Sequence, residues 1–166
     1  MSILKIVAYP DPILRKKAKP VKIIDEKIKK LVEDMVETMY AAAGIGLAAP
    51  QVGESLRVIT VDVTHKGEGL VALINPEIIS SEGECAEEEG CLSVPDFKET
   101  VRRKKKVLVK GLDLEGKEIQ IPAEGLLSIT FQHEVDHLDG ILIIDRVSRL
   151  KRDIFKKKLK KKKVTV

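Results

Sequence analysis

The heptapeptide Gln132-His133-Glu134-Val135-Asp136-His137-Leu138 decides how the sequence around it is interpreted. It lies in a stretch that we predict to be one helix, starting near Pro122 or Ala123 and ending before Gly140. Proline is tolerated in the first turn of a helix, and glycine commonly follows the last turn. In a helix, positions i and i+4 lie one above the other on the same face, so the two histidines point the same way.

The pattern H-E-x-x-H within this heptapeptide predicts a catalytic metal site. Both imidazoles can bind one ion, and Glu134 follows the first of them, where its carboxylate can hold a water molecule and accept its proton. The alternative is a chance pair of histidines on an exposed helix face. The sequence has only three histidines, and we interpret the third, His65, as an ordinary surface residue of a loop.

A catalytic site of this kind needs a third protein ligand and one open position. No glutamate follows Glu134, and the longer pattern H-E-x-x-H-x-x-G-x-x-H fails because Ile143 occupies its last position. Cys91 is a better candidate, since a thiolate with two imidazoles is a catalytic ligand set. Taken alone, Cys91 could equally be a small buried apolar residue. Weaker candidates are Asp139, Asp145 and Asp153.

A first helix is predicted from about Asp25 to Tyr40, where apolar residues recur at helical spacing. Asp25 can cap its start, and Gly44 lies just beyond its end. The apolar positions of this helix are Ile28, Leu31, Val32, Met35, Val36 and Met39.

Segments rich in Val and Ile predict strands over 56–63 and 70–79, and a hairpin over 107–122 with its turn at 113–116. A short strand is predicted over 141–145, and Ser148 can cap a last helix. Strands grouped between helices, without βαβ alternation, indicate an α+β fold. We expect one domain over 1–166, in which mixed or antiparallel strands pack around the central H-E-x-x-H helix, with an N-terminal and a C-terminal helix.

The composition, with 43% hydrophobic and 34% charged residues among 166, is that of a folded domain. We find no secretory signal and no apolar run near the roughly 18 residues of a membrane span, so we expect a cytoplasmic protein. In that compartment Cys85 and Cys91 are expected to be reduced rather than paired. The abundance of Glu and Lys favours a thermophilic source.

The C-terminal region, about 148–166, is strongly basic, with ten Lys or Arg and one Asp between Arg149 and Lys163. The net charge of the whole chain is only +4, so the body is mildly acidic. Such a region can bind RNA through its phosphates, or it can be a solvated tail without a partner.

Three segments together resemble the signature motifs of the peptide deformylases. They are Gly44-Ile45-Gly46-Leu47-Ala48-Ala49-Pro50-Gln51, Glu89-Gly90-Cys91-Leu92-Ser93 and the heptapeptide 132–138, and they occur in the order of that family. The resemblance implies hydrolysis of the formyl group from the N-terminal formyl-methionine of nascent polypeptides. It also implies contact with the ribosome through the basic C-terminal helix.

The resemblance implies a role for each matching residue. Cys91, His133 and His137 would bind the metal, and Glu134 would be the general base and then the acid. The Gln51 side chain and the Leu92 backbone N–H would stabilise the oxyanion. Ile45, Glu89, Leu126, Ile129 and His133 would border the pocket for the first side chain, normally methionine. The full set of implied substrate-binding residues is Gly44, Ile45, Gly46, Leu47, Glu89, Gly90, Leu126 and Ile129.

The ligand chemistry alone suits zinc, because one thiolate and two imidazoles match its softness and geometry. The resemblance instead implies Fe²⁺ as the physiological ion, with Zn²⁺, Ni²⁺ or Co²⁺ able to substitute. Two other functions remain open. One is a different zinc-dependent amidase or peptidase, which would act on unformylated substrates. The other is a ribosome- or RNA-binding module whose metal is structural, with a closed four-ligand site that Cys85 or an aspartate would complete.

Overall fold

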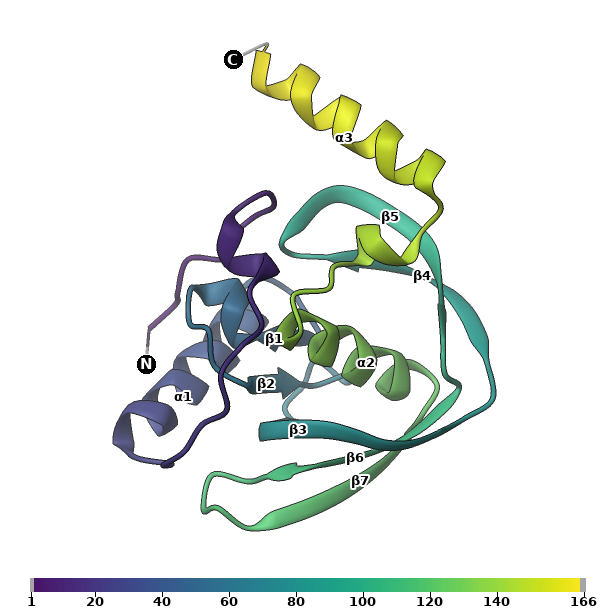
Figure 1. Ribbon diagram of the computed structural model, residues 1–166. Helices are drawn as coiled ribbons and strands as arrows, with labels where there is room; N and C mark the ends of the chain where they lie inside the picture. Colours follow the sequence, from purple (N-terminus) through teal and green to yellow (C-terminus); the bar gives the residue numbers. More distant parts are fainter. Residues whose placement is uncertain (1, 165–166) are drawn as a thin grey trace.

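The computed structural model describes residues 2–164, so the last two residues of the predicted basic region lie outside the described part. One helix, α2, lies at the centre and strands surround it, while α3 projects beyond β5 (Figure 1). The helices are α1 (Glu26–Ala41), α2 (Leu126–Leu138) and α3 (Arg149–Val164). The strands are β1 (Gly46–Ala48), β2 (Val58–Val61), β3 (Val71–Glu82), β4 (Cys85–Cys91), β5 (Val94–Arg103), β6 (Lys106–Leu112) and β7 (Glu118–Glu124).

The strands form two antiparallel sheets, which confirms the predicted α+β class. Five strands pair in the order β1-β2-β3-β6-β7, and β4 and β5 form a separate hairpin. β6 and β7 are joined by the predicted turn, in which Gly116 N–H donates to Asp113 O at 3.1 Å. The β4–β5 hairpin was not foreseen, because β4 carries a run of glutamates without apolar alternation.

The predicted start of the central helix was wrong by about one turn. Pro122 and Ala123 belong to β7, and the helix begins only at Leu126. β7 is an edge strand, where a residue without an N–H group is tolerated. Gly125, with φ of 63°, turns the chain from the strand into the helix.

The strand predicted over 141–145 was also wrong, since the chain there enters a short 3-10 helix, Ile143–Arg146. Leu142, Ile143 and Ile144 are buried in one cluster with Leu14 and Phe155. Apolar packing on several sides therefore accounts for their hydrophobicity without a pairing strand. The last helix follows, and its predicted cap is confirmed because Lys151 N–H donates to Ser148 Oγ at 3.3 Å.

Two buried clusters fix α2 and α1 in place. Phe131 and Leu138 of α2 are fully buried against Ile59, Leu73 and Val109 of the large sheet. α1 begins at the predicted cap, where Ile28 N–H donates to Asp25 Oδ1 at 3.1 Å. Its predicted apolar face packs on the same sheet through a second cluster, which includes Ile28, Val32, Met35 and Met39. The helix that carries H-E-x-x-H is therefore held rigidly.

The connection after β2 is organised by one buried carboxylate. Asp62 accepts hydrogen bonds from Tyr40 Oη at 2.5 Å, Thr64 Oγ1 at 2.6 Å and Gly67 N–H at 2.8 Å. Burial alone would raise the pKa of Asp62, but hydrogen bonds from Thr64, Tyr40 and Gly67 hold it well below the ordinary value of 3.8. Burial and the adjacent carboxylate raise the pKa of Tyr40 to about 12.

We expect Asp62 to make folding stability depend on acid pH. Unfolded chains take up a proton on Asp62 near pH 3.8, whereas the folded protein does so only at lower pH. The stabilisation is thus complete above about pH 5 and is lost as the pH falls through the folded-state pKa. The free energy of unfolding of the wild type should therefore exceed that of Asp62→Asn most at neutral pH. Urea unfolding at several pH values measures this gap, and a gap that does not shrink on acidification contradicts the assignment.

Candidate active site

Three of the predicted ligands converge at one point. The ligand atoms of Cys91, His133 and His137 lie within 4.8 Å of one another. His137 Nε2 is 3.3 Å from Cys91 Sγ and 3.2 Å from His133 Nε2. A tetrahedral ion with the usual bond lengths would require separations of about 3.3–3.6 Å between such atoms. The residues present therefore fit a metal ion.

The electrostatics of this cluster also favour a cation. Burial by itself lowers the pKa of His133. The charge of Glu134 and hydrogen bonds to Cys91 and Glu89 outweigh this effect and raise the pKa well above its ordinary value. Burial lowers the pKa of His137, so that ring is neutral, as a metal ligand must be. The raised pKa of His133 shows that the surroundings of the cluster favour a positive charge. A metal ion would supply that positive charge instead.

Glu134 lies beside the cluster in a closely fitted position. Its side chain is buried, and its Oε1 atom has no hydrogen-bond partner among the described residues. Burial raises the pKa of Glu134 to about 7. A Cβ atom at Gly46 would lie 2.5 Å from Glu134 Oε2, so only glycine allows β1 to approach this carboxylate. Glu134 is thus placed to exchange a proton with a molecule in the site.

The side chain of Gln51 is buried and aimed at the same cluster. Its Oε1 accepts from Ala48 N–H at 3.0 Å, which assigns the amide orientation. Its Nε2 is 3.1 Å from Ser93 Oγ and 3.7 Å from Cys91 Sγ. An N–H donor therefore faces the point where the three ligand atoms meet.

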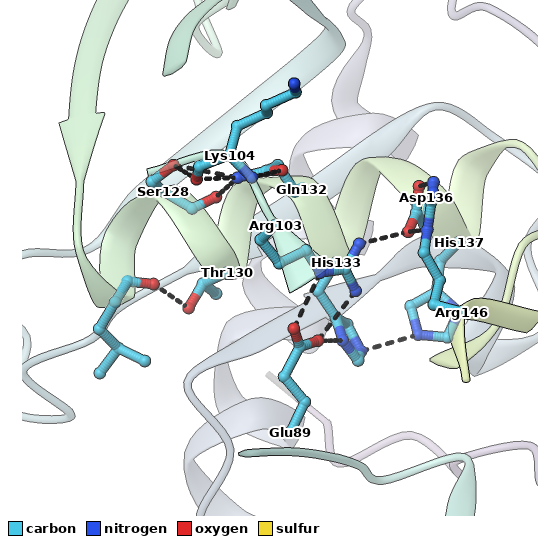
Figure 2. A network of polar contacts seen from close by, with 11 residues as sticks. Glu89, Arg103, Lys104, Ser128, Thr130, Gln132, His133, Asp136, His137 and Arg146 are labelled. Atoms are coloured by element: carbon cyan, nitrogen blue, oxygen red, sulfur yellow. Dashed lines mark hydrogen bonds and ion pairs between the residues drawn. The ribbon is translucent and has the colours of Figure 1, made fainter. Parts of the chain in front are cut away.

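A buried network of charges holds the first histidine (Figure 2). His133 Nδ1 lies 3.1 Å from Glu89 Oε1, which leaves Nε2 facing the cluster. Arg103 makes two hydrogen bonds to Glu89, both at 2.8 Å, and one to Asp136 at 2.6 Å. Arg146 donates to both carboxylate oxygens of Asp136, at 2.7 and 2.9 Å. A carboxylate on a ligand histidine fixes both its ring orientation and its tautomer.

The cluster opens on a cleft of about 970 Å³. The cleft brings together most of the predicted site residues, but Leu47 is fully buried in the core and His137 lies beneath the surface of the cleft. The predicted residues that line it are Gly44, Ile45, Gly46, Gln51, Glu89, Gly90, Cys91, Leu92, Leu126, Ile129, His133 and Glu134.

Sequence reasoning missed several residues of this site. Thr130 and Lys105 line the cleft, and Ser93 contacts Gln51. Arg103 and Asp136 carry the network behind His133, although they are 33 positions apart. Asp136 lies within the H-E-x-x-H segment, and this position was a signal that it belongs to the site. No residue near Arg103 in the sequence indicates that Arg103 pairs with Asp136. Cys85 also lines the cleft, and both cysteines are free thiols.

Comparison with known proteins agrees with this geometry. The chain matches the polypeptide deformylase family over residues 3–153. A peptide deformylase from Thermodesulfovibrio yellowstonii is 56% identical over 165 residues, which cover 98% of this chain and 100% of that protein. The chain belongs to the polypeptide deformylase family. It is therefore a metal-dependent hydrolase that removes the formyl group of formyl-methionyl peptides.

Solved structures of this family show the same architecture. A peptide deformylase from Legionella pneumophila superposes with a TM-score of 0.93 at 49% identity, covering 99% of this chain and 97% of that one. The deformylase from Thermotoga maritima gives a TM-score of 0.85 at 47% identity, covering 89% of this chain and 99% of its own. In the described part of the chain, none of the helices combines the length and the apolar character that a membrane crossing needs.

We expect Arg103→Ala to destabilise the fold strongly. The substitution leaves Glu89 and Asp136 buried without the cation that lies between them, and Asp136 keeps only Arg146. Loss of one partner of a buried ion pair typically costs about 3–5 kcal/mol. Urea unfolding at neutral pH measures the change.

Arg102→Ala is the matched control, because Arg102 is the exposed neighbour of Arg103 on β5. Its effect should stay within about 0.5 kcal/mol. Equal losses in the two variants would show that the buried pairs do not contribute as argued.

Proposed function

We propose that Glu134 carries out the proton transfers of this deformylation, beside a metal ion held by Cys91, His133 and His137. The observation that carries the proposal is the convergence of three ligand atoms next to a buried carboxylate oxygen that lacks a partner. An ion bound there supplies Lewis-acid activation of a water molecule. The remaining steps belong to side chains and backbone groups of the chain.

Glu134 carries the proton in this mechanism. Its free oxygen accepts a proton from the attacking water and then delivers it to the nitrogen of the departing peptide. Its pKa of about 7 lies near neutral pH, where one group can both accept and release a proton. The close approach of Gly46 fixes the carboxylate on one side.

Attack on the formyl carbon places negative charge on its oxygen, and two N–H donors can stabilise that charge. Gln51 Nε2 faces the ligand cluster, and the backbone N–H of Leu92 follows the Cys91 ligand directly along the chain. Each donor of this kind contributes about 3 kcal/mol to the transition state. Because Gln51 is held at both ends of its amide, it needs no rearrangement during the reaction.

Apolar residues on one side of the cleft suit the methionine side chain. Leu126 is 53% exposed although it lines the cleft, and Ile45 and Ile129 line the same cleft. Exposed apolar surface in a cleft is typical of a ligand site. The backbone of Gly44, Gly46 and Gly90 can approach the peptide closely because these residues have no side chain, and β1 holds Leu47 in the core behind them.

We expect Glu134→Gln to lower kcat by about 10²–10⁴-fold, the usual contribution of a positioned general acid–base group. The glutamine keeps the size of the side chain but cannot accept the proton. Turnover of formyl-Met-Ala-Ser and the metal content per chain should be measured on the same preparation. A variant with full metal content and wild-type kcat would refute the role of Glu134. Acetyl-Met-Ala-Ser and unblocked Met-Ala-Ser test the alternative of a general amidase or peptidase.

We infer that Fe²⁺ is the physiological ion and that Zn²⁺, Ni²⁺ and Co²⁺ can replace it. Cys91→Ala should abolish tight binding of any of them, because it removes the only sulfur ligand of the cluster. Cys85→Ala is the matched control, since Cys85 is a second free thiol on the same strand. Metal analysis after anaerobic loading with each ion, together with kcat, distinguishes the ions. Higher kcat with Zn²⁺ than with Fe²⁺ would contradict the inferred ion.

The basic C-terminal region suits contact with ribosomal RNA in the cytoplasm. α3 is anchored on the β4–β5 hairpin, where Phe155 packs on Phe97 with ring centroids 5.0 Å apart. Lys151 also pairs with Glu99 at 2.7 Å. Exposed lysines such as Lys156, Lys157 and Lys160 lie on the outer part of the helix. This anchoring presents the basic surface at a defined place on the enzyme.

Substitution of Lys156, Lys157 and Lys160 by glutamine should weaken binding to ribosomes and reduce its dependence on salt. Each phosphate contact that is lost lowers the slope of log K against log salt by about one. Glutamine at the exposed residues Lys5, Lys22 and Lys27 removes the same charge elsewhere and is the control. Equal salt slopes for the two triple variants would remove the ribosome proposal.

A further inference from the structure

The segment Gly44–Gly46, which borders the cleft, is held by the loop that follows β2. His65 Nδ1 lies 3.1 Å from Gly44 O, and Asp62 N–H donates to Ile45 O at 2.8 Å. Gly46 pairs with Val61 at the end of β2. Two consecutive carbonyl groups of the segment are therefore fixed by residues 62–65. One of these two contacts comes from a side chain.

The ring of His65 is itself held in place. Asp62 accepts from the backbone N–H of His65 at 3.2 Å, which holds the loop backbone, and Tyr40 donates to the same carboxylate at 2.5 Å. The Tyr40 and His65 rings meet edge to face, with centroids 5.5 Å apart. His65 has φ of 56°, a region that few residues other than glycine adopt. Histidine, like asparagine and aspartate, is enriched among the residues that adopt this conformation, so the loop can hold His65 there.

The donor in the contact between His65 and Gly44 follows from the chemistry of the Gly44 carbonyl. A carbonyl oxygen can only accept a hydrogen bond, so Nδ1 of His65 carries the proton and donates. This bond sets the orientation of the peptide plane between Gly44 and Ile45. That plane precedes Gly46, whose Cα faces Glu134 closely enough to exclude a Cβ atom. A rotation of the plane would therefore displace the backbone that borders the cleft.

We propose that His65 is a positioning residue for substrate binding, acting through the carbonyl of Gly44. The inference rests on the proposed function, in which the backbone of Gly44–Gly46 contacts the formyl peptide. His65 does not line the cleft and does not belong to the metal cluster. Loss of its hydrogen bond should thus weaken peptide binding. The chemical step should stay nearly unchanged, because the pairing of Gly46 with Val61 and the Asp62 N–H bond to Ile45 O keep β1 beside Glu134 without His65.

Two substitutions separate the hydrogen bond from the backbone conformation. His65→Gly tolerates positive φ but has no donor. His65→Asn also tolerates positive φ, and its side-chain N–H₂ can take the place of Nδ1. Lys66→Ala is the control, because Lys66 is the exposed neighbour in the same loop. KM and kcat for formyl-Met-Ala-Ser are measured for each, together with the Kd of the product Met-Ala-Ser.

We expect His65→Gly to raise both KM and Kd by about 3–10-fold, the value of one hydrogen bond, with kcat within about twofold. His65→Asn should restore all three to within about twofold of the wild type, and Lys66→Ala should match the wild type. Unchanged KM and Kd in the glycine variant would overturn the inference, as would an asparagine variant as impaired as the glycine variant, or a loss confined to kcat.

The same experiment separates this inference from the proposed function. A metal-loaded wild type that does not deformylate formyl-Met-Ala-Ser overturns the proposed function and the role of His65 with it. A wild type that turns over normally beside an unaffected glycine variant overturns the role of His65 alone.

Discussion

The buried ion pairs of Arg103 join the two parts of the molecule that must meet for catalysis. Arg103 lies on β5, Glu89 on β4 and Asp136 on α2, so these pairs tie the hairpin to the central helix. Cys91 comes from the hairpin and both histidines come from the helix. The elements that carry the sulfur and the ring nitrogens are thus joined by buried charges, which solvent screens only weakly. Such an arrangement is stable only because each carboxylate has a cationic partner.

The same network determines what the ligands can bind. Glu89 holds Nδ1 of His133, so that only Nε2 of that ring is available to the cluster. Gly46 closes the space beside Glu134, which leaves one carboxylate oxygen free to exchange a proton. Orientation of the proposed ligand His133 and isolation of the proposed acid–base group Glu134 thus have separate causes, one electrostatic and one steric. Both depend on α2 being locked in the core by Phe131 and Leu138.

Sequence reasoning identified the parts of this fold whose signals are local. The spacing of His133 and His137 predicts a shared helix face, and the caps Asp25 and Ser148 mark two helix starts. It failed where distant residues decide the outcome. Pro122 was interpreted as the first turn of a helix, because the sequence does not show that it lies in an edge strand, β7. The β4 strand has no apolar alternation, because it is stabilised by pairing with β5 and by Arg103 on Glu89. The partners of β4, which are β5 and Arg103, lie too far along the chain to be predicted from the sequence of β4 itself.

The place of α3 would let one chain combine an enzyme with the proposed RNA-binding surface. None of the residues that line the cleft belongs to α3, so a partner on its lysines would not have to block substrate entry. α3 nevertheless packs through Phe155 on Phe97, and Phe97 belongs to the hairpin that supplies Cys91. Buried ion pairs in turn join this hairpin to α2, which carries both histidines. The same hairpin therefore contributes both to the seat of α3 and to the candidate metal site.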